Sequence, residues 1–259
     1  MKQIPNLFTL LNLCFGCLAI IYTLQNGIMI VNNEDGTQYI DIAEKIWYAS
    51  LFIGLAGIVD FLDGFIARLM KVNSEMGKQL DSLADVVTFG VAPGLIMYQF
   101  LRMVFANGEK GIEVGGIWLL PALLIPCAAA YRLARFNLDQ SQQYGFKGMP
   151  TPAVGLLVAS FPLIYWSADV ATVSAFMQAK WASVVLYAII VVLSYLMVSK
   201  LPFMGLKFKD FSLAGNWPKL LLVIIAVLAA LFLHWLAVPV VFIVYIILSL
   251  TLGRSQPQA

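Results

Sequence analysis

Long apolar stretches recur along this chain of 259 residues, and each is close to the length that a helix needs to cross a lipid bilayer. Hydrophobic residues make up 61% of the sequence and charged residues only 12%, which excludes an ordinary soluble domain. Because backbone polar groups inside a bilayer must be hydrogen-bonded within the protein, such stretches predict helices. We therefore expect an all-α polytopic membrane helical bundle. The expected spans are 7–25, 46–68, 86–106, 116–136, 152–170, 181–200, 218–235 and 237–252.

Positive charge is divided unevenly if these spans alternate across the membrane. Twelve of the 16 Lys and Arg residues then lie on the side of the N-terminus and four on the other side. Since cytoplasmic loops are enriched in Lys and Arg, we predict a multi-pass cell-membrane protein with both termini in the cytoplasm. The net charge is only +2, and nothing in the sequence indicates nucleic-acid binding. His234 and Pro239 interrupt the last apolar run, which favours a tight helical hairpin there.

Four aspartates lie within the apolar region between residues 60 and 85. Asp60 and Asp63 are three positions apart, and Asp81 and Asp85 are four apart, so each pair lies on one face of a helix. Charged groups in membrane helices face a cavity and have partners. Like charges this close repel by roughly 4 kcal/mol per pair at an effective dielectric of about 20, which one nearby arginine cannot balance.

Hard divalent cations would balance these aspartates. The cluster offers only oxygen ligands and contains no His or Cys, so it favours Mg²⁺, Mn²⁺ or Ca²⁺ over Zn²⁺. A pair of such ions held at the end of a helix pair is suited to displacement at a diphosphate. The sequence therefore predicts a metal site, with two ions, at Asp60, Asp63, Asp81 and Asp85.

The complete pattern D-x-x-D-G-x-x-A-R-x8-G-x3-D-x3-D, from Asp60 to Asp85, resembles the signature of the CDP-alcohol phosphotransferase family. All eight defining positions match without a gap. The resemblance implies a six-helix catalytic core, Mg²⁺ or Mn²⁺ as cofactor, and a homodimer. It also implies that Asp85, the last aspartate, is the general base. Substrate contacts would come from Gly64, Ala67, Arg68 and Gly77.

The N-terminal segment from Pro5 to Asn12 resembles the start of these transferases, where the Asn and Thr lie near the nucleotide end of the site. Asn6 and Thr9 are therefore candidate substrate-binding residues. An equally good interpretation is a helix start with Pro in its first turn and Asn as its cap.

A second polar segment contains Arg132 and Arg135, three positions apart at a helix end, followed by the run from Phe146 to Pro152 that includes Lys147. Guanidinium groups bind phosphate and carboxylate bidentately. The alternative is that these residues only follow the enrichment of positive charge on the cytoplasmic side. The segment resembles the phosphatidylserine synthase branch of the family, and it is expected on the same side of the membrane as the aspartates.

Together these resemblances imply transfer of a phosphatidyl group from CDP-diacylglycerol to L-serine, with release of CMP. Within the same class the acceptor could instead be glycerol 3-phosphate or inositol. From a different class, buried acidic groups are also found in cation-coupled transporters.

The expected organisation is a six-helix catalytic membrane domain over residues 1–200, followed by an interfacial loop and a C-terminal helical hairpin over residues 201–259. The mixture of apolar and basic residues in 201–217 suits the surface of an anionic membrane. Small residues at helical spacing, Gly90 with Gly94 and Gly54 with Gly57, predict close helix packing.

Overall fold

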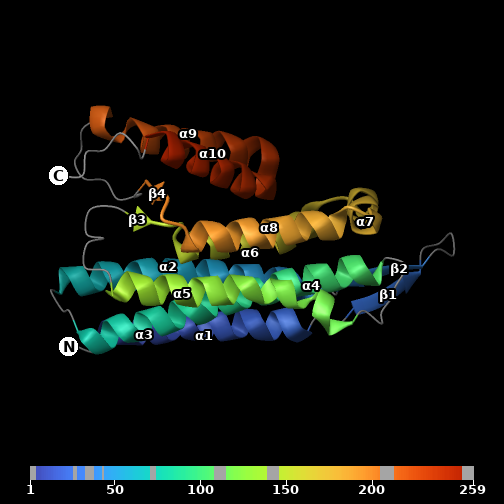
Figure 1. Ribbon diagram of the computed structural model, residues 1–259, viewed down its shortest axis with the longest axis horizontal. Helices are drawn as coiled ribbons and strands as arrows, with labels where there is room; N and C mark the ends of the chain where they lie inside the picture. The colour runs from blue at the N-terminus through green and yellow to red at the C-terminus, as the bar shows by residue number, and fades with distance from the viewer. Residues whose placement is uncertain are drawn as a thin grey trace.

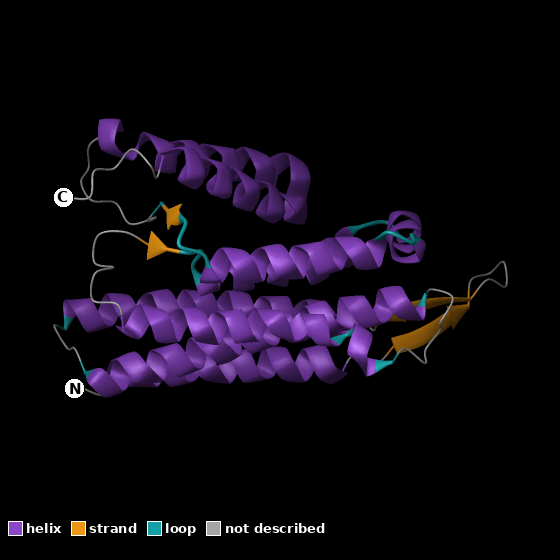
Figure 2. Ribbon diagram, in the orientation of Figure 1, coloured by secondary structure: helices purple, strands orange, loops and turns teal. Residues whose placement is uncertain are grey.

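The computed structural model describes residues 4–25, 28–32, 38–42, 44–70, 74–107, 115–138, 146–204 and 213–252. Long helices run nearly parallel to one another (Figure 1), and helix dominates the described chain (Figure 2). The expectation of an all-α polytopic membrane bundle is confirmed. The helices are α1 (Ile4–Gln25), α2 (Trp47–Leu69), α3 (Glu75–Asp85), α4 (Ala92–Ala106), α5 (Leu124–Leu138), α6 (Thr151–Ser167), α7 (Val170–Gln178), α8 (Ala182–Val198), α9 (Leu213–Leu233) and α10 (Ala237–Leu252).

Each of the eight predicted spans overlaps one of these helices, although the span 116–136 begins in 3₁₀ turns and α5 starts only at Leu124. Among the described residues, four helical stretches are long and apolar enough to cross a membrane, and α6 and α8 are shorter apolar helices. The four stretches are Pro5–Gln25, Trp47–Leu69, Glu75–Ala106 and Trp217–Thr251. The last stretch turns at His234, which has a φ of 49° and lies in a short 3₁₀ turn, so α9 and α10 form the predicted hairpin.

Two short strand pairs and one helix were not expected from the sequence. Strand β1 (Ile28–Asn32) pairs antiparallel with β2 (Gln38–Ile42) in the polar break after α1, where alternating β-branched residues favour strands. Strand β3 (Phe146–Lys147) pairs antiparallel with β4 (Pro202–Phe203) at the opposite end of the bundle. Helix α7 is capped by Asp169, whose carboxylate accepts a 2.9 Å bond from the Thr172 amide.

Helices α3 and α4 form one continuous rod, although the sequence placed the start of this span at residue 86. The Ser74 hydroxyl caps α3 by accepting a 2.9 Å bond from the Gly77 amide. A π-helical segment, Val86–Val91, joins α3 to α4. Such segments are rare and cluster at functional sites, and this one begins directly after Asp85.

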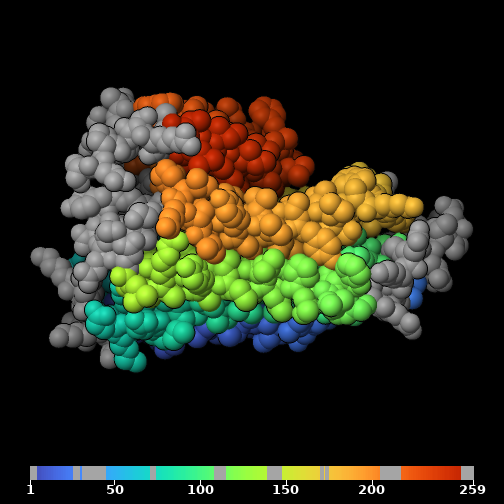
Figure 3. All heavy atoms as spheres, in the orientation of Figure 1, coloured from blue at the N-terminus to red at the C-terminus, as the bar shows by residue number. Residues whose placement is uncertain are grey.

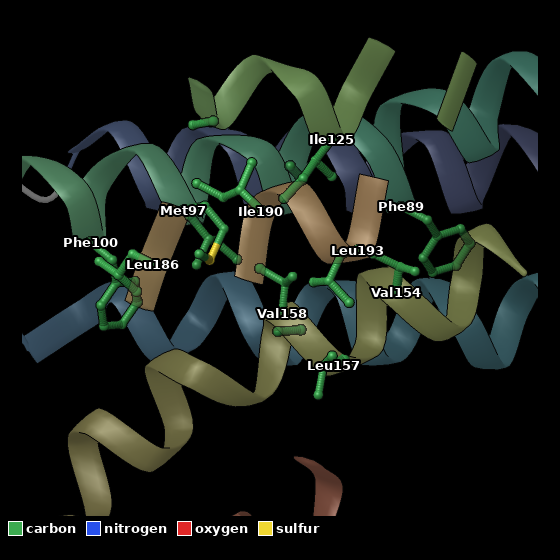
Figure 4. Packing of buried hydrophobic residues seen from close by; sticks show 14 of the residues in the cluster. Phe89, Met97, Phe100, Ile125, Val154, Leu157, Val158, Leu186, Ile190 and Leu193 are labelled. Atoms are coloured by element: carbon green, nitrogen blue, oxygen red, sulfur yellow. The ribbon is translucent and has the colours of Figure 1, made fainter. Parts of the chain in front are cut away.

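The apolar core lies where α4, α5, α6 and α8 meet. Buried Phe89, Met97, Val154 and Ile190 belong to this cluster, in which Phe89 lies near Val154 and Met97 lies near Ile190 (Figure 4). A Cβ at Gly155 would lie 2.9 Å from the Phe89 side chain, so that glycine lets α6 approach the rod closely.

The predicted glycine contacts are only partly present. Cβ atoms at Gly90 and Gly94 would lie 2.9 Å from Ala129 and 2.7 Å from Pro126, so α5 packs closely against the rod there, as predicted. The prediction was wrong for Gly54, where a Cβ would meet nothing within 4 Å. At Gly57, three positions along the same helix, a Cβ would lie 3.7 Å from the Leu156 side chain of α6, an ordinary contact that does not require glycine.

The C-terminal hairpin forms a further layer against the rest of the bundle (Figure 3). Helix α10 contacts α6 and β4, whereas α9 packs mainly on α10. The division at residue 200 stays a prediction. Of the expected interfacial segment 201–217, residues 205–212 lie outside the described part of the chain.

Candidate active site

Three aspartates from two helices form the centre of the site. One carboxylate oxygen from each of Asp60 and Asp63 on α2 and Asp81 on α3 lies within 4.8 Å of the others. We call this group the aspartate triad. Asp63 is buried, and Asp60 and Asp81 are half-buried. The helical spacing of the sequence pattern thus brings carboxylates that are up to 21 positions apart to one point.

Asp85, the fourth aspartate of the pattern, lies beside the triad but is not part of it. Its side chain is only 7% exposed and interacts electrostatically with all three triad residues. The Asn12 amide nitrogen donates to Asp85 Oδ1 over 3.4 Å. The four predicted ligands therefore fall into two groups. Three carboxylates meet in the triad, and the fourth, that of Asp85, is hydrogen-bonded by Asn12 of α1.

Helix α1 supplies a row of polar side chains to this site. The Thr9 hydroxyl lies 3.0 Å from Asp63 Oδ2 and 3.2 Å from the Pro5 carbonyl. A Cβ at Gly77 would lie 3.1 Å from Asn6 Oδ1, so Asn6 is next to the start of α3. Asn6 and Thr9 thus lie at the site, as predicted. Their contact with substrate stays a prediction.

Asn12 is a site residue that the sequence analysis did not select. It is fully buried, contacts Asp85, and its backbone carbonyl accepts a 3.2 Å bond from the Thr88 hydroxyl in the π-helical segment. A Cβ at Gly16 would clash with Thr88, so α1 and the rod are in close contact there. The signal was present in the sequence, because Asn6, Thr9 and Asn12 follow one another at intervals of three on one helix face.

The residues present fit a divalent metal. The triad offers only oxygen ligands, which Mg²⁺ and Mn²⁺ prefer. Two arginines near the site bond neutral acceptors. Arg68, the arginine of the pattern, donates Nε to the Gly64 carbonyl over 2.9 Å, and Arg132 on α5 donates to the Thr151 hydroxyl over 3.0 Å. These hydrogen bonds leave the negative charge of the triad unbalanced, and a bound cation would balance it.

The small residues of the pattern take two different positions. A Cβ at Gly64 would meet nothing within 4 Å, so there is open space beside α2, whereas Gly77 packs against Ser74 and Asn6. Ala67 is half-buried and Arg68 is exposed, both one helical turn beyond the triad. Open space at Gly64 is compatible with a ligand against the helix, and the substrate contacts of these residues stay predictions.

Arg132 and Arg135 have different surroundings although they are neighbours on α5. Arg132 is buried, lies within electrostatic range of Asp85, and has an Nε atom without a hydrogen-bond partner. Arg135 instead donates to the Val198 carbonyl of α8 over 2.8 Å and lines a surface hollow with Tyr131, Ala134 and Leu138. For the third predicted cation, Lys147, the structure describes only the backbone, in β3.

Polar contacts between α3 and the end of α5 were also not predicted. Lys78 Nζ donates to the Asn137 carbonyl over 3.2 Å, and the Asn137 amide donates to the Ser82 hydroxyl over 2.8 Å. These bonds join the helix that carries Asp81 and Asp85 to the helix that carries Arg132. The expectation that the arginines lie at the same end of the bundle as the aspartates is confirmed by these contacts.

Comparison with known proteins supports the same interpretation of the site. Residues 2–208 match the family described as CDP-alcohol phosphatidyltransferase. A Bacillus subtilis protein named CDP-diacylglycerol–serine O-phosphatidyltransferase is 33% identical over 171 residues, which cover 64% of this chain and 78% of that protein.

Two further relatives carry the same name. The Helicobacter pylori protein is 37% identical over 156 residues, which cover 60% of this chain and 54% of the relative. A Mycobacterium tuberculosis protein is 29% identical over 243 residues, which cover 89% of this chain and 70% of the relative. This chain thus spans only about half the length of the Helicobacter relative.

Proposed function

Because this chain belongs to the CDP-alcohol phosphatidyltransferase family, we propose that it is a phosphatidylserine synthase in phospholipid biosynthesis. It transfers the phosphatidyl group of CDP-diacylglycerol to L-serine and releases CMP. The observation that carries the proposal is the aspartate triad, with carboxylate oxygens from two helices within 4.8 Å of one another. The name shared by the relatives supports serine as the acceptor.

We propose that the triad holds Mg²⁺ or Mn²⁺, and that Asp85 completes a site for two ions. When bound, such ions neutralise the diphosphate and stabilise negative charge on the departing CMP. Thr9 fixes the orientation of Asp63 through its 3.0 Å bond. Asn12 does the same for Asp85 from α1.

The transfer step follows from these positions. The serine hydroxyl oxygen attacks the phosphorus that carries the diacylglycerol group, a new P–O bond forms to serine, and the P–O bond to CMP breaks. Asp85 accepts the serine proton as general base. Asp85 is buried, which limits the access of bulk water, a competing nucleophile, to this base.

Arg132 is the best placed of the three candidate cations for the serine carboxylate. It is buried near Asp85 and has an unpaired Nε, and a buried guanidinium donor without a partner is costly unless an anion binds it. Gly64 and the neighbouring Ala67 and Arg68 would lie against the nucleotide part of the donor. Glycerol 3-phosphate and inositol are the alternative acceptors.

The site faces the cytoplasm in this proposal. The described helix ends near the triad carry Arg68, Lys78, Arg132, Arg135 and Lys200, whereas the opposite ends carry Lys45, Arg102 and Lys180. Serine reaches the site from the aqueous side, and the lipid tails remain in the bilayer. The homodimer that the family resemblance implies stays a prediction.

A purified-protein assay tests the function. CMP release from CDP-diacylglycerol should require both a divalent metal and L-serine, and EDTA should abolish it. Parallel reactions with glycerol 3-phosphate and inositol identify the acceptor. Use of either alcohol in place of serine would contradict the serine assignment and leave the metal site intact. Absence of CMP release with every acceptor would favour the transporter alternative.

A further inference from the structure

Helix α10 lies beyond residues 2–208 that match the family, yet it returns to the polar end of the bundle. Tyr245 and Ser249 are one helical turn apart on α10, and both are almost fully buried. The Tyr245 hydroxyl donates to the Met204 carbonyl over 3.0 Å, and the Met204 amide donates to the Ser249 hydroxyl over 3.2 Å. Two side chains of α10 thus satisfy both backbone polar groups of Met204.

The segment that α10 holds in this way is paired with the polar segment before α6. Met204 directly follows β4, in which Phe203 pairs with Phe146 and Pro202 with Lys147. The Phe203 ring also stacks on the Tyr245 ring, with centroids 6.0 Å apart. Strands of two residues are too short to be stable alone. The position of β3 therefore depends on neighbouring segments, and the contacts that α10 makes with β4 are part of this support.

The residues that follow β3 connect it to Thr151, the hydrogen-bond partner of Arg132. The Gly148 amide donates to the Leu201 carbonyl over 2.9 Å, with a φ of 81° that favours glycine. The Met149 amide donates to the Leu196 carbonyl over 2.9 Å. Helix α6 then begins at Thr151, whose hydroxyl accepts the 3.0 Å bond from Arg132.

Tyr245 also lies in the neighbourhood of Arg132, which in turn lies near Asp85. The C-terminal hairpin therefore contributes to the surroundings of the buried arginine as well as to the segment that leads to Thr151. The side-chain hydrogen bonds to Asp63 and Asp85 come instead from Thr9 and Asn12 of α1.

We propose that Tyr245 and Ser249 are positioning residues for the alcohol acceptor, and that the C-terminal hairpin forms part of the acceptor half of the site. They fix the Phe203–Met204 backbone, which orders the segment leading to Thr151 and so sets the position of Arg132. This inference rests on the proposed function, because it takes Arg132 as the group that binds the serine carboxylate. The hairpin determines acceptor affinity and leaves the metal and donor sites unchanged.

Steady-state kinetics on the full-length protein test this proposal. Tyr245→Phe keeps the stacked ring and removes the hydroxyl, and Ser249→Ala removes the other bond. Loss of one hydrogen bond should raise the KM for serine about fivefold in each variant. The KM for CDP-diacylglycerol and the Mn²⁺ affinity, measured by metal-induced thermal stabilisation, should change by less than about twofold.

Matched substitutions away from the site serve as controls. Tyr195→Phe changes an exposed tyrosine on α8, and Ser167→Ala changes an exposed serine whose hydroxyl bonds its own helix. Neither should alter the KM for serine. A Tyr245→Phe or Ser249→Ala protein with an unchanged KM for serine would overturn the positioning role while the synthase function stands.

A merely structural role has a different signature. In that case both KM values, metal affinity and melting temperature would worsen together in the two variants, and the proposal would be overturned. Failure of the wild-type protein to use serine would instead contradict the proposed function. The same KM comparison would then be made with the alcohol that is used. Because the two variants remove different bonds to Met204, misfolding of one leaves the other as a test.

Discussion

Replacing Asp81 by Asn removes one charge from the aspartate triad at nearly constant volume. The described residues provide no hydrogen bond to the Asp81 carboxylate, whereas Thr9 and Asn12 hold Asp63 and Asp85. The substitution therefore changes the metal site without breaking a hydrogen bond among the described residues. At 4.8 Å, the upper limit for the triad oxygens, two ionised carboxylates repel by about 3.5 kcal/mol at an effective dielectric of about 20.

Two of the three triad pairs involve Asp81, so at this dielectric the substitution relieves at least about 7 kcal/mol of repulsion when all three groups are ionised. The metal-free Asp81→Asn protein should consequently be at least as stable to heat as the wild type. Metal binding should weaken, because one of three anionic ligands is lost. CMP release should fall at least a hundredfold, which corresponds to about 2.7 kcal/mol of transition-state stabilisation.

Thermal unfolding in detergent, with and without Mn²⁺, measures the first two effects, and the CMP assay measures the third. Asp169→Asn is the matched control. Asp169 is the exposed N-cap of α7, far from the triad in sequence, and Asn caps helices equally well. Near-normal CMP release by Asp81→Asn, or an undiminished rise in melting temperature on adding Mn²⁺, would refute the metal assignment.

Three further outcomes are expected. Asp85→Asn should still bind CDP-diacylglycerol in the presence of metal but lose transfer; a joint loss of binding and transfer would identify Asp85 chiefly as a ligand. Arg132→Lys keeps the charge and removes the planar fork, so it should raise the KM for serine more than Arg135→Lys, whose arginine bonds a backbone carbonyl; equal effects would count against this assignment. Gly77→Ala would place a Cβ 2.8 Å from Ser74 Oγ and should lower activity by displacing the start of α3. Gly54→Ala is the control: a Cβ there meets nothing within 4 Å, so activity and melting temperature should change little.

The parts of the structure that could be predicted depend on short-range spacing. Apolar length identified the eight helical spans, because a bilayer fixes how long such a helix must be. Intervals of three and four positions placed Asp60 with Asp63, and Asp81 with Asp85, on common helix faces. The hairpin at His234 was also predictable, since only two residues interrupt the apolar run.

Features that depend on contacts between distant segments were not predictable in the same way. The π-helical segment after Asp85 lies in close contact with α1, where Thr88 packs against Gly16, and the spacing of the sequence does not reveal this contact. The β3–β4 pair joins residues that are 55 and 57 positions apart. In our proposal the contacts of α10 order this pair. Gly54 and Gly90 are both glycines in apolar helices, and the structure is needed to show that only Gly90 lies against a neighbouring helix.

The two halves of the proposed site differ in how they are built, and this bears on how substrate choice can change within such a bundle. The donor half is formed by α1, α2 and α3, whose functional side chains are fixed by helical spacing. The acceptor half is assembled from the end of α5, the β3–β4 pair and α10, and the bonds of Lys78 and Asn137 join α5 to α3. Residues that order the acceptor half can therefore vary without disturbing the metal ligands. A change of acceptor would accordingly require substitutions around Arg132 and Tyr245, with the aspartate pattern retained.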